Sequence, residues 1–379
     1  MSLAHEGLSR GPGHERGTHQ AASGKGGAAL KDRGQVNAHT HCYSGLVPLG
    51  MPAPQPQPEC FIEILERVWW RLDRALDHES LAAAARYYMG EALLAGTTGL
   101  IDHHESPSCI EGSLDVLADA AEELGMCAVL TYGASERNGG REEAQRGLAE
   151  CRRFISQNRR PLVRGVVGVH APFTVSDDTL REAGELAREL QTVTHMHLAE
   201  DQTDGADARA KGYAGPLERA LSLGALPRGS ILAHGVHLTA QEVRACATNG
   251  VWVVQNPRSN RANGVGAPEH LDLTELAALG TDGFPSQMES ELAEFSDGAG
   301  ALRLAAGERL MAERFDGDVV ELAGDFKGGV VRQLVVDGRP IVQDGVLMSA
   351  NRESVEQEAR AQAARLWIRM DNQGAGGEA

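Results

Sequence analysis

The chain has 379 residues, 53 of them acidic and 36 basic, and its formal net charge at pH 7 is −17. This charge argues against binding to nucleic acid or to an anionic membrane surface, so we expect a small-molecule partner. No stretch reaches the ~18 apolar residues of a membrane span, and the N-terminus has no apolar signal-peptide core. Six scattered cysteines without CxxC spacing indicate reduced thiols, which predicts a cytoplasmic protein.

Residues 1–34 are rich in glycine, alanine and charge, which predicts a loose tail or the remnant of an accessory β domain. From residue 35 to residue 317, apolar runs of strand length alternate with helical patterns such as 79–95, 115–124 and 178–190. The eight runs are 35–43, 98–103, 127–132, 164–170, 192–198, 230–234, 251–255 and 276–281. Strands that alternate with helices form a parallel sheet, and eight such units predict an α/β fold, a (β/α)8 barrel of TIM type.

A long insertion at 45–74 follows the first predicted strand and contains five prolines between Pro48 and Pro58. In a barrel this insertion would lie over the C-terminal mouth, where the βα loops build active sites. We therefore regard it as a candidate substrate lid, with a proline-rich surface loop of no such role as the alternative.

The pattern changes after the barrel. Between about residues 300 and 325 we identify no regular helix or strand pattern. The runs 331–336 and 340–342, joined by Asp337-Gly338, predict a hairpin within a small, reduced accessory β region at 318–350. The segment 351–379 predicts a helix over 353–370 and a tail. The apolar side of this helix carries Ala359, Ala363, Leu366, Trp367 and Met370.

Histidines and one aspartate stand at the ends of several predicted strands. His39 and His41 are two residues apart on the first strand, so both side chains project from the same face. His197, His234 and Asp282 end three later strands, at the barrel face where catalysis occurs. Neutral imidazoles and one carboxylate form the ligand set of a catalytic divalent-metal site, so the sequence predicts a metal-dependent hydrolase.

Other polar side chains are expected at the same face. His103 and His104 end the second strand and His170 ends the fourth, which makes them candidates for substrate contacts. A buried, hydrogen-bonded structural role is an equal alternative for each. Arg258 follows the seventh strand and could bind an anionic substituent, with an ion pair inside its loop as the alternative.

The order HxH, HxHxxE, AHGVHL and GTDG resembles the amidohydrolase superfamily. The similarity is to its aminohydrolase and chlorohydrolase branch, which contains cytosine, guanine and S-adenosylhomocysteine deaminases, and it extends from about Val36 to Glu294. Within this branch, the segment 96–107 followed by 112–115 is most similar to aminohydrolases linked with selenium metabolism.

This resemblance implies that His39, His41, His197 and Asp282 hold one divalent ion, Zn²⁺ by preference and Fe²⁺ or Mn²⁺ as alternatives. Relatives with two metals often bridge them by a modified lysine on the fourth strand. That strand ends here in Gly168-Val169-His170, which favours a single metal.

The resemblance also implies roles for the catalytic residues. Glu200 would move a proton from the nucleophile to the leaving group, and His234 would hydrogen-bond the attacking hydroxide or the substrate. Asp282 would ligate the metal and accept the proton of its water. The expected activity is hydrolytic deamination of a small heterocycle by metal-activated hydroxide. Alternatives are a dechlorinase or amidase of the same branch, or a catalytically impaired metal-binding scaffold, and a homodimer is left open.

Overall fold

The computed structural model describes residues 33–315, 322–327 and 330–374. The predicted tail at 1–34 lies almost entirely outside these residues, as does the predicted boundary between residues 317 and 318. Among the described residues, no helix is both long enough and apolar enough to cross a membrane.

A parallel sheet forms the centre of the molecule, which confirms the predicted (β/α)8 barrel. All eight predicted runs contain a strand, and the fourth is divided in two at Val166. The strands pair in the order β1-β2-β3-β5-β6-β7-β8-β9, with β4 beside β3. They are β1 (Gln35–Thr40), β2 (Thr97–His104), β3 (Cys127–Ala134), β4 (Val163–Gly165), β5 (Val167–Val169), β6 (Thr194–Leu198), β7 (Ile231–His234), β8 (Trp252–Gln255) and β9 (Ala277–Leu279).

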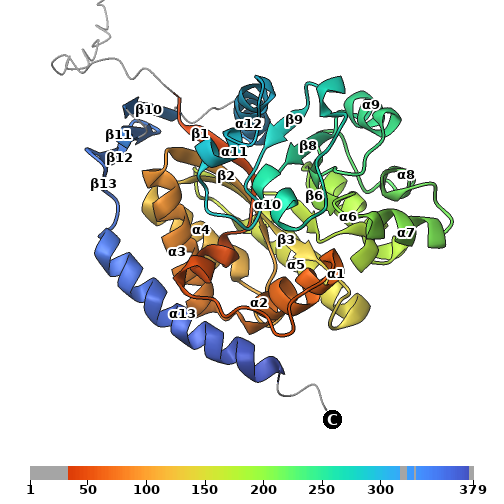
Figure 1. Cartoon of the computed structure of the whole chain (residues 1–379), viewed down its shortest axis with the longest axis horizontal. Helices are drawn as coiled ribbons and strands as arrows, with labels where there is room; N and C mark the ends of the chain where they lie inside the picture. The colour runs from red at the N-terminus through yellow and green to blue at the C-terminus, as the bar shows by residue number, and fades with distance from the viewer. Residues whose placement is uncertain (1–32, 316–321, 328–329, 375–379) are drawn as a thin grey trace, which may run out of the picture.

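Helices surround this sheet (Figure 1). The three helices predicted from periodicity are present, and Ser176 caps α6 by accepting a hydrogen bond from the amide of Thr179. The helices of the barrel are α3 (His78–Leu94), α4 (Ser113–Leu124), α5 (Gly140–Gln157), η3 (Pro172–Thr174), α6 (Asp177–Glu189), α7 (Gln202–Ala210), α8 (Pro216–Ser222), α9 (Ala240–Asn249), α10 (Pro257–Ala262), η4 (Leu271–Leu273), α11 (Met288–Leu292) and α12 (Ala299–Arg314).

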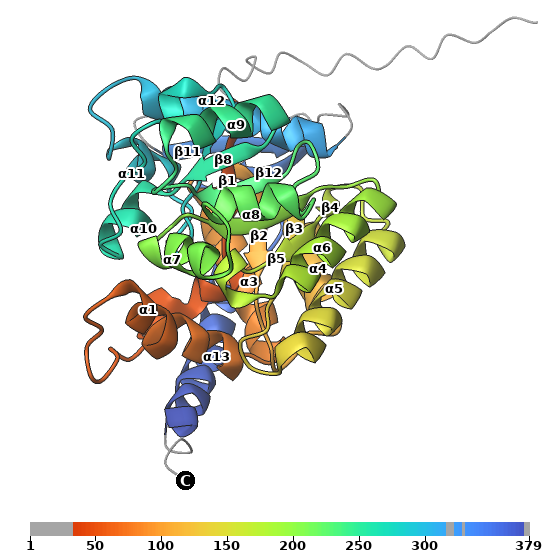
Figure 2. The same cartoon turned by 90° about the vertical axis from the view of Figure 1, so that its right-hand side faces the viewer.

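Helix α12 corrects the expectation of no regular structure after residue 300. It packs against β1 and β9, and its side chains Ala306, Leu310 and Met311 join the apolar cluster of the barrel strands. The side view places α12 at the top of the barrel, away from α1 and α13 (Figure 2). The helix therefore covers the seam where the last strand returns to the first.

The insertion after β1 is largely helical. It contains η1 (Cys42–Leu49), α1 (Phe61–Ile64), the π-helical turn η2 (Leu65–Trp69) and α2 (Trp70–Ala75). Phe61 and Leu65 are buried and pack in one apolar cluster with Val236 and Val265 of later loops. The insertion is thus fixed against the C-terminal side of the barrel, where it was predicted to lie.

The C-terminal part adds a small antiparallel sheet and a long helix. The sheet has the order β10 (Leu322–Lys327), β11 (Val330–Val336), β12 (Arg339–Gln343) and β13 (Val346–Leu347). The predicted hairpin is confirmed, and both turn residues, Asp337 and Gly338, have positive φ. Helix α13 (Arg352–Gly374) buries the predicted apolar side against α2 and α3.

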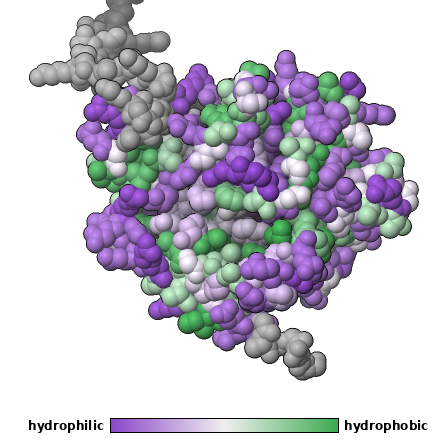
Figure 3. Space-filling model, in the orientation of Figure 1, coloured by the Kyte–Doolittle hydropathy of each residue, from purple (hydrophilic) through white to green (hydrophobic). Residues whose placement is uncertain are grey.

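Hydrophilic residues cover most of the face seen in Figure 1, and the apolar residues on it lie in separate small groups (Figure 3).

Candidate metal centre

The site begins with the close approach of β9 to β1. The amides of Thr281 and Asp282 both donate to the carbonyl oxygen of His39, at 3.0 Å each. Gly280 allows this approach, because a Cβ there would lie 2.5 Å from Asn256 Oδ1 and 2.7 Å from the His39 carbonyl oxygen. The backbone thus places the carboxylate of Asp282 beside the histidines of β1.

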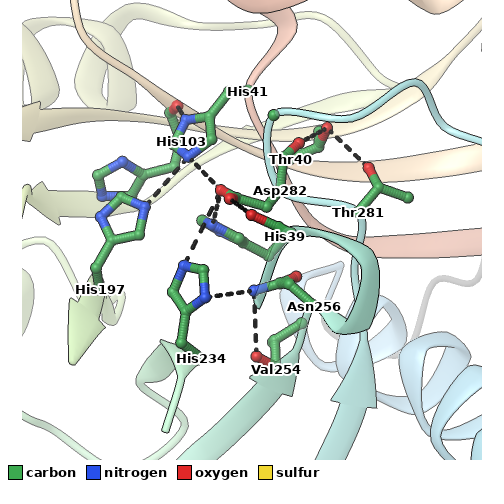
Figure 4. Close-up of polar contacts among 12 residues, drawn as sticks. His39, Thr40, His41, His103, His197, His234, Val254, Asn256, Thr281 and Asp282 are labelled. Carbon is green, nitrogen blue, oxygen red and sulfur yellow. Dashed lines mark hydrogen bonds and ion pairs between the residues drawn. The ribbon is translucent and has the colours of Figure 1, made fainter. Parts of the chain in front are cut away.

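One oxygen of Asp282 lies at the centre of the predicted ligands (Figure 4). Asp282 Oδ1 is 2.9 Å from His41 Nε2, 3.3 Å from His39 Nε2 and 4.0 Å from His234 Nε2. His197 Nε2 lies 3.2 Å from His41 Nε2. These five residues come from four separate strand ends, as the sequence predicted.

Hydrogen bonds on the opposite ring nitrogens determine the tautomers of three histidines. His41 Nδ1 donates to the carbonyl oxygen of His103, and His197 Nδ1 donates to that of His170 at 2.7 Å. His234 Nδ1 donates to Asn260 Oδ1 at 2.8 Å. Since Nδ1 carries the proton, each Nε2 presents its lone pair toward Asp282, which is how metal-ligating histidines are usually oriented.

The donor set fits a divalent cation. His39 Nε2 and His234 Nε2 are buried and have no hydrogen-bond partner among the described residues. Ligand atoms of His39, His197, His234 and Asp282 lie within 4.8 Å of one another, so His234 is placed as close to the cluster as the predicted ligands. Buried lone pairs without a partner are costly unless a cation or water satisfies them.

The electrostatics of the cluster also favour a cation. Burial lowers the pKa of His39 to about 3, which keeps this ring neutral. Burial also lowers the pKa of His41, but Asp282 and Glu105 outweigh that effect and raise it to about 9. Burial raises the pKa of Asp282, yet the imidazoles of His39 and His41 that face its carboxylate hold the pKa well below its usual range. A bound cation would take the place of the His41 proton as the partner of this carboxylate.

Glu200 lies beside the cluster without joining it. Its Oε2 is 3.5 Å from His234 Nε2, and Asn263 Nδ2 donates to its Oε1 at 3.3 Å. Burial and the nearby carboxylate of Asp282 raise the pKa of Glu200 well above its usual value. A carboxyl group whose pKa is raised by burial is suited to general acid–base chemistry.

Backbone strain is concentrated at the same place. Ala199, His234 and Asp282 are non-glycine residues with φ of 55°, 76° and 54°. Such conformations cost roughly 1–3 kcal/mol each and persist where the surroundings fix them. For Ala199 the fixing contact is a 2.6 Å hydrogen bond from its amide to Asp204 Oδ2, which also sets the direction of the Glu200 that follows.

A pocket opens above the cluster. Its walls come from the insertion, from the loops after β2, β5 and β6, and from the segment around Asp282. The lining residues are His41, Tyr43, Phe61, Leu65, Trp69, Trp70, Asp73, Glu105, His170, Ala171, Phe173, His197, Glu200, Asp201, Asp204, Asn263, Asp282 and Gly283. The described lining contains six carboxylates and neither lysine nor arginine.

The residues predicted to contact substrate have different positions. His170 lines the pocket, whereas His103, His104 and Arg258 do not. His103 and His104 are fully buried and hydrogen-bonded to Glu105 and Ser106, so the structural alternative describes them better. Arg258 forms a 2.6 Å ion pair with the buried Glu291, so its loop satisfies the charge.

Two residues that line the pocket, Glu105 and Asp73, were not predicted. Ser259 and Asn260 of α10 belong to a polar loop that the sequence places at the same mouth, but their partners were not predicted: Ser259 donates to Asp282, and Asn260 accepts from His234. Glu105 directly follows the two histidines of β2, so its place at a strand end was available in the sequence. The contact of Asn260 with His234 spans 26 positions, and no local pattern indicates it.

Fold and site together define a (β/α)8-barrel protein with a histidine–carboxylate metal centre at the C-terminal ends of its strands. The family model described as "Amidohydrolase family" matches residues 34–339. The chain therefore belongs to the amidohydrolase family.

Curated relatives are deaminases. The chain is 30% identical over 276 residues to an 8-oxoguanine deaminase of Pseudomonas aeruginosa, covering 68% of this chain and 61% of the relative. It is 31% identical over 277 residues to a 5-methylthioadenosine/S-adenosylhomocysteine deaminase of Halothermothrix orenii, covering 72% and 60%. The chain thus matches about three fifths of the length of these relatives.

Solved structures support the fold. An adenosine deaminase from Xanthomonas campestris with bound zinc aligns with a TM-score of 0.74 at 22% identity, covering 88% of this chain and 85% of that one. An atrazine chlorohydrolase from Arthrobacter aurescens complexed with zinc aligns with a TM-score of 0.72 at 18% identity, covering 87% of each chain. The finer resemblance to aminohydrolases linked with selenium metabolism stays a prediction.

Proposed function

We propose that this protein is a metal-dependent aminohydrolase that removes an amino group from a small heterocycle. The proposal rests on the position of Glu200, a buried carboxyl with a raised pKa. Its Oε2 lies 3.5 Å from His234 Nε2, beside a cluster of imidazole nitrogens that have no hydrogen-bond partner among the described residues. The deaminase relatives support the same reaction class.

His39, His41, His197 and Asp282 would hold the ion, with His234 at the same cluster. When bound, a divalent ion supplies Lewis-acid chemistry and makes water a nucleophile near neutral pH. Zinc is the ion we propose, because imidazole and carboxylate ligands suit it and zinc occurs in the aligned structures.

The protein groups move the protons. Nδ1 of His234 donates to Asn260, so its Nε2 accepts a hydrogen bond from the attacking water and orients it. Asp282 accepts a proton from that water, and the hydroxyl of Ser259 donates to its second oxygen. Glu200 in its protonated form delivers a proton to the ring nitrogen, and Asp282 passes the proton from the water to the departing amine, which leaves as ammonia. The hydroxyl formed on the carbon then returns a proton to Glu200 as the C–N bond breaks and the carbonyl forms.

The pocket favours a planar substrate without anionic groups. Phe61, Trp69, Trp70 and Phe173 supply aromatic walls, and the carboxylates of the lining repel phosphate and carboxylate substituents. Cytoplasmic localisation and a homodimer remain predictions that this proposal does not require.

A screen for ammonia release by the zinc-loaded full chain tests the proposal. Purines, pterins, pyrimidines and triazines are the substrate classes to include, each with a chelator-treated control. We expect zinc-dependent ammonia from at least one class. Chloride release from a chlorinated triazine without ammonia from any compound would favour the dechlorinase alternative, and no product at all would favour the scaffold.

A further inference from the structure

Glu105, directly after β2, lines the pocket and uses only one of its two carboxylate oxygens in a hydrogen bond within the described residues. The side chain is buried, and its Oε1 accepts a 2.6 Å hydrogen bond from His103 Nδ1. Its Oε2 has no hydrogen-bond partner among the described residues, although Glu105 lines the pocket. His41 Nδ1 lies 3.6 Å from this oxygen but donates to the carbonyl oxygen of His103 instead. A buried acceptor of this kind calls for a donor from outside the protein.

The surroundings hold this carboxylate in one orientation. The second nitrogen of His103 donates to the carbonyl oxygen of Val169 at 3.1 Å, so the ring that positions Glu105 is fixed at both ends. Gly133 provides the space, because a Cβ there would lie 2.5 Å from His103 Cε1 and 2.7 Å from Glu105 Oε1. The free oxygen is therefore presented by a preorganised group.

His170 offers a second acceptor nearby. The hydroxyl of Thr174 donates to the carbonyl oxygen of Ala171, so Thr174 Oγ1 accepts from His170 Nδ1 at 3.2 Å. The other nitrogen, Nε2, then carries the lone pair, and His170 lines the pocket. One ligand atom each of Glu105, His170 and His197 lies within 4.8 Å of the others, so Glu105 and His170 approach one another at the pocket.

Two converging acceptors can bind either a cation or a pair of N–H groups. A second divalent ion would find only Glu105 and His170, because His197 Nε2 already faces His41 Nε2 in the central cluster. Trp70 and Phe173 each lie 6.3 Å from the His170 ring between centroids, so a planar ligand would have aromatic neighbours. These contacts favour a flat heterocycle that donates two hydrogen bonds.

We propose that Glu105 and His170 form a specificity subsite for an amidine-type edge of the substrate, in which a ring N–H lies next to an exocyclic amino group. Glu105 Oε2 accepts from one N–H and His170 from the other. The inference rests on the proposed function for the identity of the ligand as a substrate. It selects, within the aminated heterocycles, those that carry such an edge in addition to the carbon under attack.

Binding measurements test the subsite without requiring turnover. The probes are 2-aminobenzimidazole, which has the N–H edge, and 1,2-dimethylbenzimidazole, which has the same ring system without N–H donors. Calorimetry on the zinc-loaded full chain should show tighter binding of the amino compound. In Glu105→Gln the side-chain carbonyl can still accept from His103 while the amide NH₂ faces the pocket. The Kd of 1,2-dimethylbenzimidazole divided by the Kd of 2-aminobenzimidazole should therefore fall by about 10-fold or more.

Asp201→Asn is the matched control. Asp201 also lines the pocket, and as the N-cap of α7 it can be replaced by asparagine, which is an equally good cap. If general negative charge attracts the probe, this variant will lower the ratio as much as Glu105→Gln does, and the proposal is wrong. An unchanged ratio in Glu105→Gln, or a second zinc equivalent bound by the wild type and lost in Glu105→Gln, would also overturn it. If Glu105→Gln fails to fold, the same ratio of Kd values is measured in His170→Gln.

Discussion

At the scale of single residues, the chemistry depends on which nitrogen of each histidine carries the proton. His41, His197 and His234 all donate through Nδ1 to oxygen acceptors, so their Nε2 lone pairs meet at one point. The acceptors come from elsewhere in the chain and include two backbone carbonyls. Glu200 stands apart from this arrangement, since its raised pKa comes from burial and from Asp282 and not from a hydrogen bond to a ligand. Metal binding and proton transfer should therefore be separable by substitution.

Glu200→Gln should retain the metal and lose turnover. The amide cannot carry the proton, and general acid–base groups are worth about 10²–10⁴-fold, so kcat should fall by at least that order. Metal analysis and steady-state kinetics on the same preparation give the comparison. His197→Ala is the contrasting variant, because it should lose metal as well as activity. A Glu200→Gln protein that turns over near the wild-type rate with its metal bound would refute the proposed role.

Asp204 provides a test of electrostatics through pH. Burial raises the pKa of Asp204 to about 7, against the hydrogen bond from Ala199, which lowers it. Because the folded-state pKa lies above the unfolded value, the stability from this group is full at low pH and is lost as pH rises through about 7. Asp204→Asn keeps an acceptor for Ala199 but does not titrate. Relative to wild type, its free energy of unfolding should therefore rise by on the order of 1 kcal/mol between pH 5 and pH 8. Urea unfolding gives this free energy at both pH values. A difference between variant and wild type that is the same at pH 5 and pH 8 would contradict the prediction.

At the scale of elements, the junction of β9 with β1 places the carboxylate among the imidazoles. The junction is short: one parallel bridge joins Thr40 and Asp282, and the carbonyl of His39 accepts two amides from the β9 side. Helix α12 covers it from outside. A small displacement here would move Asp282 relative to His39 and His41 together.

Gly280→Ala should disturb both stability and metal binding. Its Cβ would lie within 2.8 Å of Asn256 Oδ1 and of two backbone atoms of His39, and backbone atoms cannot give way easily. Overpacking of this kind costs typically 1–3 kcal/mol. Gly298→Ala is the control, since nothing lies within 4 Å of its added Cβ and its φ is −77°. Thermal unfolding and zinc content of both variants give the readout; equal behaviour would contradict the account of the junction.

The sequence predicted the elements whose pattern is local. The eight strands are continuous apolar runs, and the hairpin has its Asp337-Gly338 turn, so these followed from spacing alone. Helix α12 was missed because it contacts the strands partly through small residues, which give little apolar periodicity. At Gly307, for example, an added Cβ would lie only 3.2 Å from the carbonyl oxygen of Val36. At the site, the motifs HxH and GTDG indicated the cluster of His39, His41 and Asp282. The partners that orient it, such as the carbonyl of His170, depend on tertiary contacts.

At the scale of the whole molecule, two elements are added to the barrel: the insertion after β1 and the C-terminal helix α13. The insertion η1–α2 forms part of the pocket wall, and α13 packs against α2 from outside. Arg369 Nε on α13 donates to the carbonyl oxygen of Ala75 at 2.8 Å, which links the end of the insertion to the C-terminal helix. A direct contact therefore links α13 to the insertion that forms part of the pocket wall.

The requirement for a single metal ion is tested by titrating zinc into the metal-free chain while ammonia release is followed on any substrate found in the screen. We expect activity to be absent without metal, to rise linearly with added zinc and to stop rising at about one equivalent per chain. Ligand atoms of His39, His197, His234 and Asp282 lie within 4.8 Å of one another, and the fourth strand carries no bridging lysine, which is why a single equivalent is expected. Activity in the metal-free protein, or a rise that continues to two equivalents, would contradict the account.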